Sequence, residues 1–95
     1  MTSNIESFKS IVEELISTYE NKNRDYGNSF ENMCDKFGLL AAAIPLNNKV
    51  ERINSLIINK ENKVNESLAD SLKDLANYAI MTLIYINKHG KDKQI

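Results

Sequence analysis

Hydrophobic residues recur at helical spacing along almost the whole chain, and this pattern predicts an all-α fold. The clearest case is residues 65–89, which contain neither glycine nor proline and predict the longest helix. Five apolar residues there fall on one line at roughly 100° per residue. We expect them to form the spine of the core: Leu68, Leu72, Leu75, Ala79 and Ile86.

The same spacing predicts three shorter helices before the long one. A capping box, Ser3 followed by Glu6, starts a helix over residues 4–20. A helix over residues 29–37 should end at Gly38, and a helix over residues 39–59 should kink or break at Pro45. We therefore predict a small bundle of three to four helices in a single domain over residues 1–95. The first helix carries an apolar stripe that we expect to be buried: Ile5, Phe8, Ile11, Val12, Leu15, Ile16 and Tyr19.

Length and composition narrow the class of protein. A chain of 95 residues is near the lower limit for burying an adequate core, so we expect a homo-oligomer. The formal net charge of −1 argues against nucleic acid as a partner. The single cysteine, Cys34, is predicted to be a core side chain and not a nucleophile. With no signal pattern and an apolar run too short for a bilayer, we expect a cytoplasmic protein with no membrane contact.

Acidic and amide side chains lie on one face of the predicted long helix. Glu66, Asp70 and Asp74 follow one another at four-residue intervals, and Asn77 continues the line. Asp and Asn are poor helix-interior residues, and like charges four residues apart repel. Because local stability does not explain these residues, they are candidate site residues.

The segment over residues 21–30 combines cations, an acid, an aromatic ring, amides and a glycine. The alternative to a site is a plain connection, in which Gly27 takes a positive φ and Asn28 or Ser29 caps the next helix. In the functional interpretation it is a donor-rich loop that binds an anion or a base through Lys22, Arg24, Asp25, Tyr26 and Asn28.

Two further cations, Lys49 and Arg52, lie beside the apolar stripe of the predicted 39–59 helix. In a structural interpretation they pair with Asp70 and Asp74 and only hold the helices in register. In a functional interpretation the carboxylates hold Mg²⁺ through waters or bind a base or ribose, while the cations bind phosphate. The residues alone leave both interpretations open.

Three spaced motifs resemble the signature of the nucleotide-modification-associated domain family, which is common in bacteriophages and prophages. The resemblance covers about residues 8–87. It implies that the loop, the cationic pair and the acidic face meet at one nucleotide-related site. The motifs are Lys22-Asn23-Arg24-Asp25-Tyr26-Gly27-Asn28-Ser29-Phe30, the spacing Lys49-x-x-Arg52, and Glu66-Ser67-Leu68-Ala69-Asp70 continuing through Asp74 and Asn77 to Met81.

More distantly, the acidic helix is similar to that of the MazG-like all-α nucleoside triphosphate pyrophosphohydrolases. Those enzymes complete a Mg²⁺ site with a second acidic cluster on a preceding helix. At that place this chain has the basic run Lys49-Val50-Glu51-Arg52, and Ser67 stands where the enzyme motif places a glutamate. Clustered cations facing three anions suit binding better than hydrolysis.

We favour a phage or prophage protein that binds and sequesters a nucleotide or a cyclic nucleotide-type immune signal in the host cytoplasm. This binding requires no cofactor, although Mg²⁺ can take part. The alternative is a Mg²⁺-dependent pyrophosphohydrolase with Glu66, Asp70 and Asp74 as metal ligands and Asp25 or Glu51 as a further carboxylate. A third interpretation is a structural interaction module in which the charged faces only set helix register. The binding hypothesis places the ligand against Lys22, Arg24, Asp25, Tyr26, Asn28, Lys49, Arg52, Asp70, Asp74 and Asn77.

Overall fold

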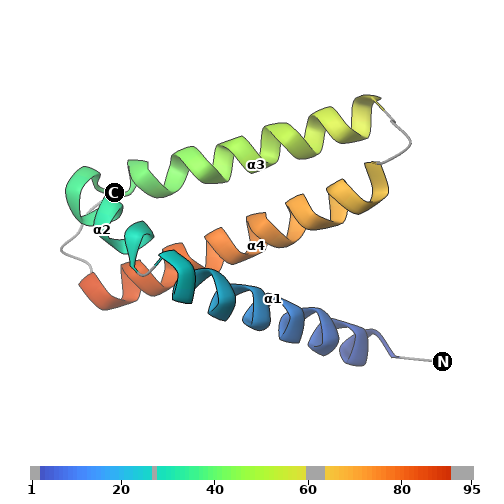
Figure 1. Ribbon diagram of the computed structural model, residues 1–95, viewed down its shortest axis with the longest axis horizontal. Coiled ribbons are helices and arrows are strands. Elements are labelled where there is room, and N and C mark those ends of the chain that lie inside the picture. Colours follow the sequence, from blue (N-terminus) through green and yellow to red (C-terminus); the bar gives the residue numbers. More distant parts are fainter. Residues whose placement is uncertain (1–2, 27, 60–63, 91–95) are drawn as a thin grey trace.

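Four helices make up the fold in the computed structural model, which describes residues 3–26, 28–59 and 64–90, without the side chains of residues 25, 26 and 64–67. No strand occurs within these ranges, so the predicted all-α class and small helical bundle are confirmed. None of the described helices contains an apolar stretch of the length and hydropathy that a membrane span requires. The helices are α1 (Asn4–Tyr26), α2 (Ser29–Phe37), α3 (Leu40–Asn59) and α4 (Val64–His89) (Figure 1).

Local sequence signals set several helix ends as expected. The Ser3 hydroxyl accepts a hydrogen bond from the Glu6 backbone N–H at 3.2 Å, which is the predicted cap of α1. Gly38 ends α2 with a φ of +74°, a left-handed conformation that favours glycine, and its N–H donates to the Cys34 carbonyl at 2.8 Å. Asn28 occupies the N-cap position of α2 but makes no side-chain capping bond there. Gly27 lies outside the described residues.

The first helix is longer than its apolar pattern predicts. It continues from residue 20 to Tyr26, so most of the expected donor-rich loop is instead the last turns of α1. Arg24 donates to the Asn21 side-chain oxygen at 2.6 Å, three residues earlier on the same helix. The helix dipole also favours cations in the last turn. Local polar pairs of this kind can extend a helix beyond the end of its apolar stripe.

Of the kink or break expected at Pro45, the break does not occur, because α3 is one helix from Leu40 to Asn59 with Pro45 inside it. Proline removes a single backbone donor and crowds the carbonyl four residues earlier. The first turn of α3 is held by backbone bonds from Ala41 to Gly38 and from Ala43 to Leu39. Since α3 packs along α4 over the most extensive helix contact in the described structure, tertiary packing outweighs the local penalty.

The core lies mainly between α2, α3 and α4, with α3 and α4 running side by side in opposite directions (Figure 1). Cys34, which is 1% exposed, packs with Ala42 and Tyr85, as expected for a core cysteine. Burial raises the pKa of the Cys34 thiol, and the nearby carboxylates of Asp35 and Glu31 raise it further. The thiolate is therefore disfavoured, in agreement with a packing role.

The predicted spine of α4 is only partly covered. Among the described side chains of this helix, Ser71 and Tyr85 are buried, about four turns apart on nearly the same side. Of the predicted spine, Leu68, Leu75 and Ile86 are half-buried, whereas Leu72 and Ala79 are exposed. Since the helix is apolar nearly all round over residues 78–86, periodicity does not single out the side that meets α3.

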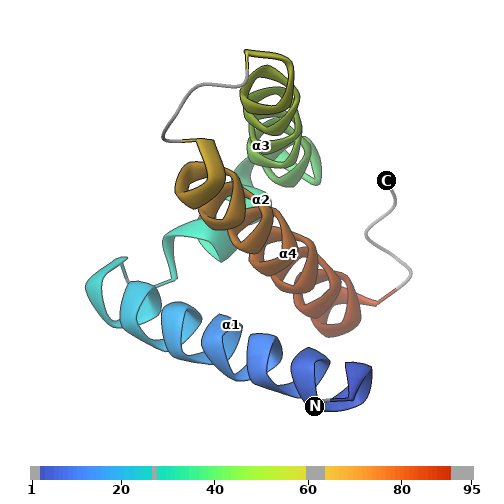
Figure 2. The same cartoon turned by 90° about the vertical axis from the view of Figure 1, so that its right-hand side faces the viewer.

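The apolar stripe of α1 is also mostly uncovered. Leu15 is buried and Val12 is half-buried, but Ile5, Phe8 and Ile16 are exposed. The physical reason is the position of α1, which packs on the side of α4 away from α3 and covers little of it (Figure 2). The expectation of a buried face over the whole stripe is therefore wrong within the described chain.

Candidate functional site

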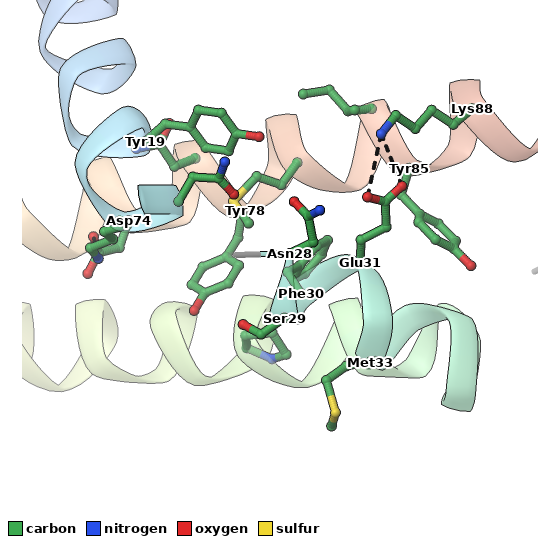
Figure 3. A pocket seen from close by; sticks show the side chains of 17 residues that line it. Tyr19, Asn28, Ser29, Phe30, Glu31, Met33, Asp74, Tyr78, Tyr85 and Lys88 are labelled. Carbon is green, nitrogen blue, oxygen red and sulfur yellow. Dashed lines mark hydrogen bonds and ion pairs between the residues drawn. The ribbon is translucent and has the colours of Figure 1, made fainter. Parts of the chain in front are cut away.

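A pocket of about 520 Å³ lies where the end of α1, the starts of α2 and α3, and the middle of α4 meet (Figure 3). This volume falls in the roughly 300–1,000 Å³ range of small-molecule sites. Its walls combine aromatic rings, side-chain amides and charged groups of both signs.

An ion-pair network at Asp74 joins three helices on one side of the pocket. One Asp74 oxygen lies 3.4 Å from the ammonium nitrogen of Lys22 on α1, and the other lies 3.1 Å from that of Lys49 on α3. The Asp74 and Lys49 side chains are only about a quarter exposed, whereas Lys22 is more than half exposed. Lys49 therefore holds the carboxylate in place, while Lys22 is the cation that faces solvent and the pocket.

Amides from three elements line the same pocket. Asn77 on α4 donates its side-chain N–H to the Leu15 carbonyl on α1 at 3.3 Å. This bond ties the two helices together and fixes the orientation of the Asn77 amide at the pocket wall. Asn23 and Asn28 line the pocket from either side of the short α1–α2 connection.

Aromatic rings supply the apolar part of the walls. Phe30 and Tyr78 lie with ring centroids 5.9 Å apart at an interplanar angle of 48°. Tyr19 lines the pocket from α1 and Tyr85 from the far end of α4 (Figure 3). Rings placed in this way offer flat surface to a planar ligand.

A second charged group closes the pocket near the end of α4. Lys88 pairs with Glu31 at 3.1 Å, and the Tyr85 hydroxyl donates to Asp35 at 2.8 Å. Burial raises the pKa of Tyr85 to about 12, and the hydrogen bond to Asp35 acts in the same direction. The His89 and Tyr85 rings lie with centroids 4.1 Å apart at an interplanar angle of 36°, and the His89 Nε2 atom is 3.6 Å from an Asp35 oxygen.

None of the candidate site residues predicted from the sequence belongs to this group, although His89 lies within the predicted 65–89 helix and α4 is helical through His89. The sequence contains one signal for this group. Glu31 and Asp35 are four residues apart on one predicted helix, and Tyr85 and His89 are four residues apart on the longest one.

The structure brings some of the predicted site residues together and not others. The pocket is lined by Lys22, Asn28, Asp74 and Asn77. Lys49 does not line it but forms an ion pair with Asp74, which does. The exposed residues Arg24, Arg52 and Asp70 do not line it. The side chains of Asp25, Tyr26 and Glu66 lie outside the described residues, so their placement stays a prediction.

The structure does not test the predicted metal ligands. In the part of the chain that the structure describes, no three His, Cys, Asp or Glu side chains are grouped to hold a metal ion. Glu66 belongs to the predicted set, and its side chain is not described. The Mg²⁺ set of Glu66, Asp70 and Asp74 therefore stays a prediction.

The model of a family described as nucleotide modification associated domain 1 matches residues 22–86. The chain belongs to this family. The match confirms the resemblance inferred from the motifs, and no curated protein or solved structure gives a match. All residues that line the pocket, except Tyr19 and Lys88, lie within the matched part of this nucleotide modification associated domain.

Proposed function

We propose that this nucleotide modification associated domain binds a nucleotide, or a small signalling molecule derived from one, and holds it unchanged in the pocket. The observation that supports the proposal is the position of the family motifs. Lys22, Asn23, Asn28, Ser29 and Phe30 from the first motif line the same pocket as Asp74, Asn77, Tyr78 and Met81 from the last.

The pocket walls carry groups for each part of such a ligand. Tyr78 and Phe30 offer aromatic surface on which a base can stack. The amides of Asn23 and Asn28 can both donate to and accept from the edge of a base. Lys22 and Lys88 provide ammonium groups for phosphate oxygens at opposite ends of the pocket.

The Asp74 network suggests how phosphate would enter. The contact of Asp74 with Lys22 is the longer and more exposed of its two ion pairs. A phosphate group can therefore replace Asp74 as the partner of Lys22 at small cost, since exposed pairs contribute little stability. Lys49 would keep Asp74 in place during this exchange, so that the pocket wall does not collapse.

The biological role that we propose is sequestration of a nucleotide-type immune signal by a phage or prophage protein in the host cytoplasm. The balance of charge supports binding over hydrolysis, because two lysines surround Asp74, where the enzyme alternative needs a free metal-binding carboxylate. A binding protein of this kind requires no cofactor.

The test is to incubate the purified protein with nucleoside triphosphates, cyclic nucleotides and Mg²⁺, remove unbound material, denature it, and identify what is released by mass spectrometry. We expect an intact compound, lost in Lys22→Ala and retained in Lys9→Ala, which removes an exposed lysine of α1 outside the pocket lining. Release of no nucleotide from the wild type would contradict the proposal. Monophosphate and pyrophosphate would instead support the enzyme alternative.

A further inference from the structure

The chain exposes more surface than a monomer of its size. Its accessible surface is 7442 Å², whereas a folded monomer of 10.8 kDa has about 5,500 Å². Its radius of gyration is 15.2 Å, against about 12.4 Å for a compact domain of this length. The excess of about 1,900 Å² is larger than the roughly 800 Å² that each partner buries in a stable dimer.

Exposed apolar side chains occur on all four helices, and one group of them lies along α1 and the second half of α4. We call it the α1–α4 face, and its centre is a groove of about 220 Å³ between the two helices. Phe8 on α1 is 66% exposed, and Leu83 on α4 is 59% exposed. Ile16 of α1 and Ile80 and Ile84 of α4 line the groove. We include in the face the exposed residues Ile5 and Phe8, which continue the line of Val12 and Ile16 at helical spacing, and Leu83, which precedes Ile84.

We propose that a second copy of this chain packs on the α1–α4 face. The described residues include only five buried apolar side chains, which is a small core for a chain of 95 residues. If the α1–α4 face serves as part of the core, it must be covered in every folded molecule. A second copy of the chain is always available to cover it. A two-fold dimer places the same apolar helices of both copies against each other.

The second copy also closes the ligand pocket, a part of the inference that rests on the proposed function. Tyr19, Asn77, Met81 and Ile84 line both the pocket and the apolar groove, so the two hollows are adjacent. A chain seated in the groove therefore contacts side chains that also line the pocket, and extends the pocket wall on that side. The nucleotide is bound by two chains together.

The dimer is tested without any nucleotide, by sedimentation equilibrium of the full chain over a range of concentrations. We expect twice the mass of 10.8 kDa for the wild type, and a thermal midpoint that rises with protein concentration. Ile80→Glu should give the single-chain mass, because it places a charge in the centre of the face. Ile58→Glu, at a position 74% exposed on α3 and outside the α1–α4 face, should leave the dimer intact.

If Ile80→Glu fails to fold, Phe8→Glu makes the same test from the other helix at a more exposed position. A wild type that sediments as a single chain at all concentrations, with a concentration-independent midpoint, would overturn the proposal. The proposal would also be overturned if Ile58→Glu dissociated the dimer while Ile80→Glu and Phe8→Glu did not. A stable complex with a different protein in place of the dimer would overturn it as well.

The closure of the pocket has its own measurement. Nucleotides retained by the wild type should bind at least about tenfold more weakly to folded, monomeric Ile80→Glu or Phe8→Glu, and with unchanged affinity to Ile58→Glu. Equal affinity in the monomeric variants would overturn the shared pocket and leave the proposed function in place. A dimer that binds no nucleotide at all would contradict the proposed function and the shared pocket, and leave only the dimer.

Discussion

Tyr85 is a residue whose pKa is raised both by burial and by a nearby negative charge. It is 5% exposed, lies against the His89 ring, and donates a hydrogen bond from its hydroxyl to Asp35. Both burial and the nearby carboxylate favour the neutral phenol over the phenolate, which is why the pKa of Tyr85 rises from 10.0 to about 12. One side chain therefore links the core to the charged group between α2 and α4.

This raised pKa predicts a specific loss of stability in alkali. Below pH 10 the phenol is protonated in both states; between pH 10 and 12 only the unfolded chain loses its proton, so the free energy of unfolding falls as pH rises. We expect the wild type to lose more stability across this window than Tyr85→Phe. Urea unfolding at a series of pH values measures the difference, and parallel pH profiles for the two proteins would contradict the prediction.

At the scale of single elements, α3 carries a local penalty that tertiary packing overcomes. Pro45 leaves the Ala41 carbonyl without its usual helical donor, although the helix continues to Asn59. Pro45 is also half-buried and lines the pocket, so its ring contributes packing where its backbone costs stability.

Pro45→Ala should therefore stabilise the protein. Alanine restores the missing backbone bond, a gain of about 3 kcal/mol from helix propensity. Lost ring packing and a freer unfolded chain offset part of it, so we expect the free energy of unfolding to rise by about 1–2 kcal/mol in urea unfolding.

The matched control is Asn48→Ala, an exposed position three residues later on the same helix. Its gain is limited to ordinary helix propensity, at most about 0.7 kcal/mol. A less stable Pro45→Ala would mean that the ring's packing at the pocket outweighs the backbone penalty.

At the scale of the whole molecule, Asp74 is the point where three helices are joined by charge. It pairs with Lys22 of α1 and Lys49 of α3 from its own position on α4. The other α1–α4 links are the Asn77 bond to Leu15 and the Lys73 pair with Glu14. Since α1 covers little of α4, these polar contacts carry much of its attachment.

Asp74→Asn should lower the free energy of unfolding by about 1–2 kcal/mol, because it leaves the half-buried Lys49 side chain without its partner carboxylate. A fully buried pair would cost about 3–5 kcal/mol, but these side chains keep some contact with water. Asp70→Asn makes the same change of charge one turn earlier at an exposed position, and should stay within about 0.5 kcal/mol of the wild type. Equal effects in urea unfolding would show that Asp74 acts only through net charge.

The sequence by itself determined what depends on residues close together in the chain. Ser3 caps α1 and Gly38 ends α2, since each makes its bond within four residues. Apolar spacing predicted the four helices, and the motifs of residues 22–86 identified the family. Even so, the local rules failed over residues 21–26 and at Pro45, where polar side-chain pairing and tertiary packing prevailed.

Only the tertiary structure decided which helix faces are covered and which side chains meet. In the folded chain α4 buries Ser71 and leaves Leu72 exposed, and Tyr85 is buried against Cys34 of α2 and Ala42 of α3. Lys22 and Asp74 are 52 residues apart in the chain, and Glu31 and Lys88 are 57 apart, yet each pair is in contact. Such contacts depend on how whole helices cross, and this arrangement is set by the sum of many weak packing interactions, which no single local pattern specifies.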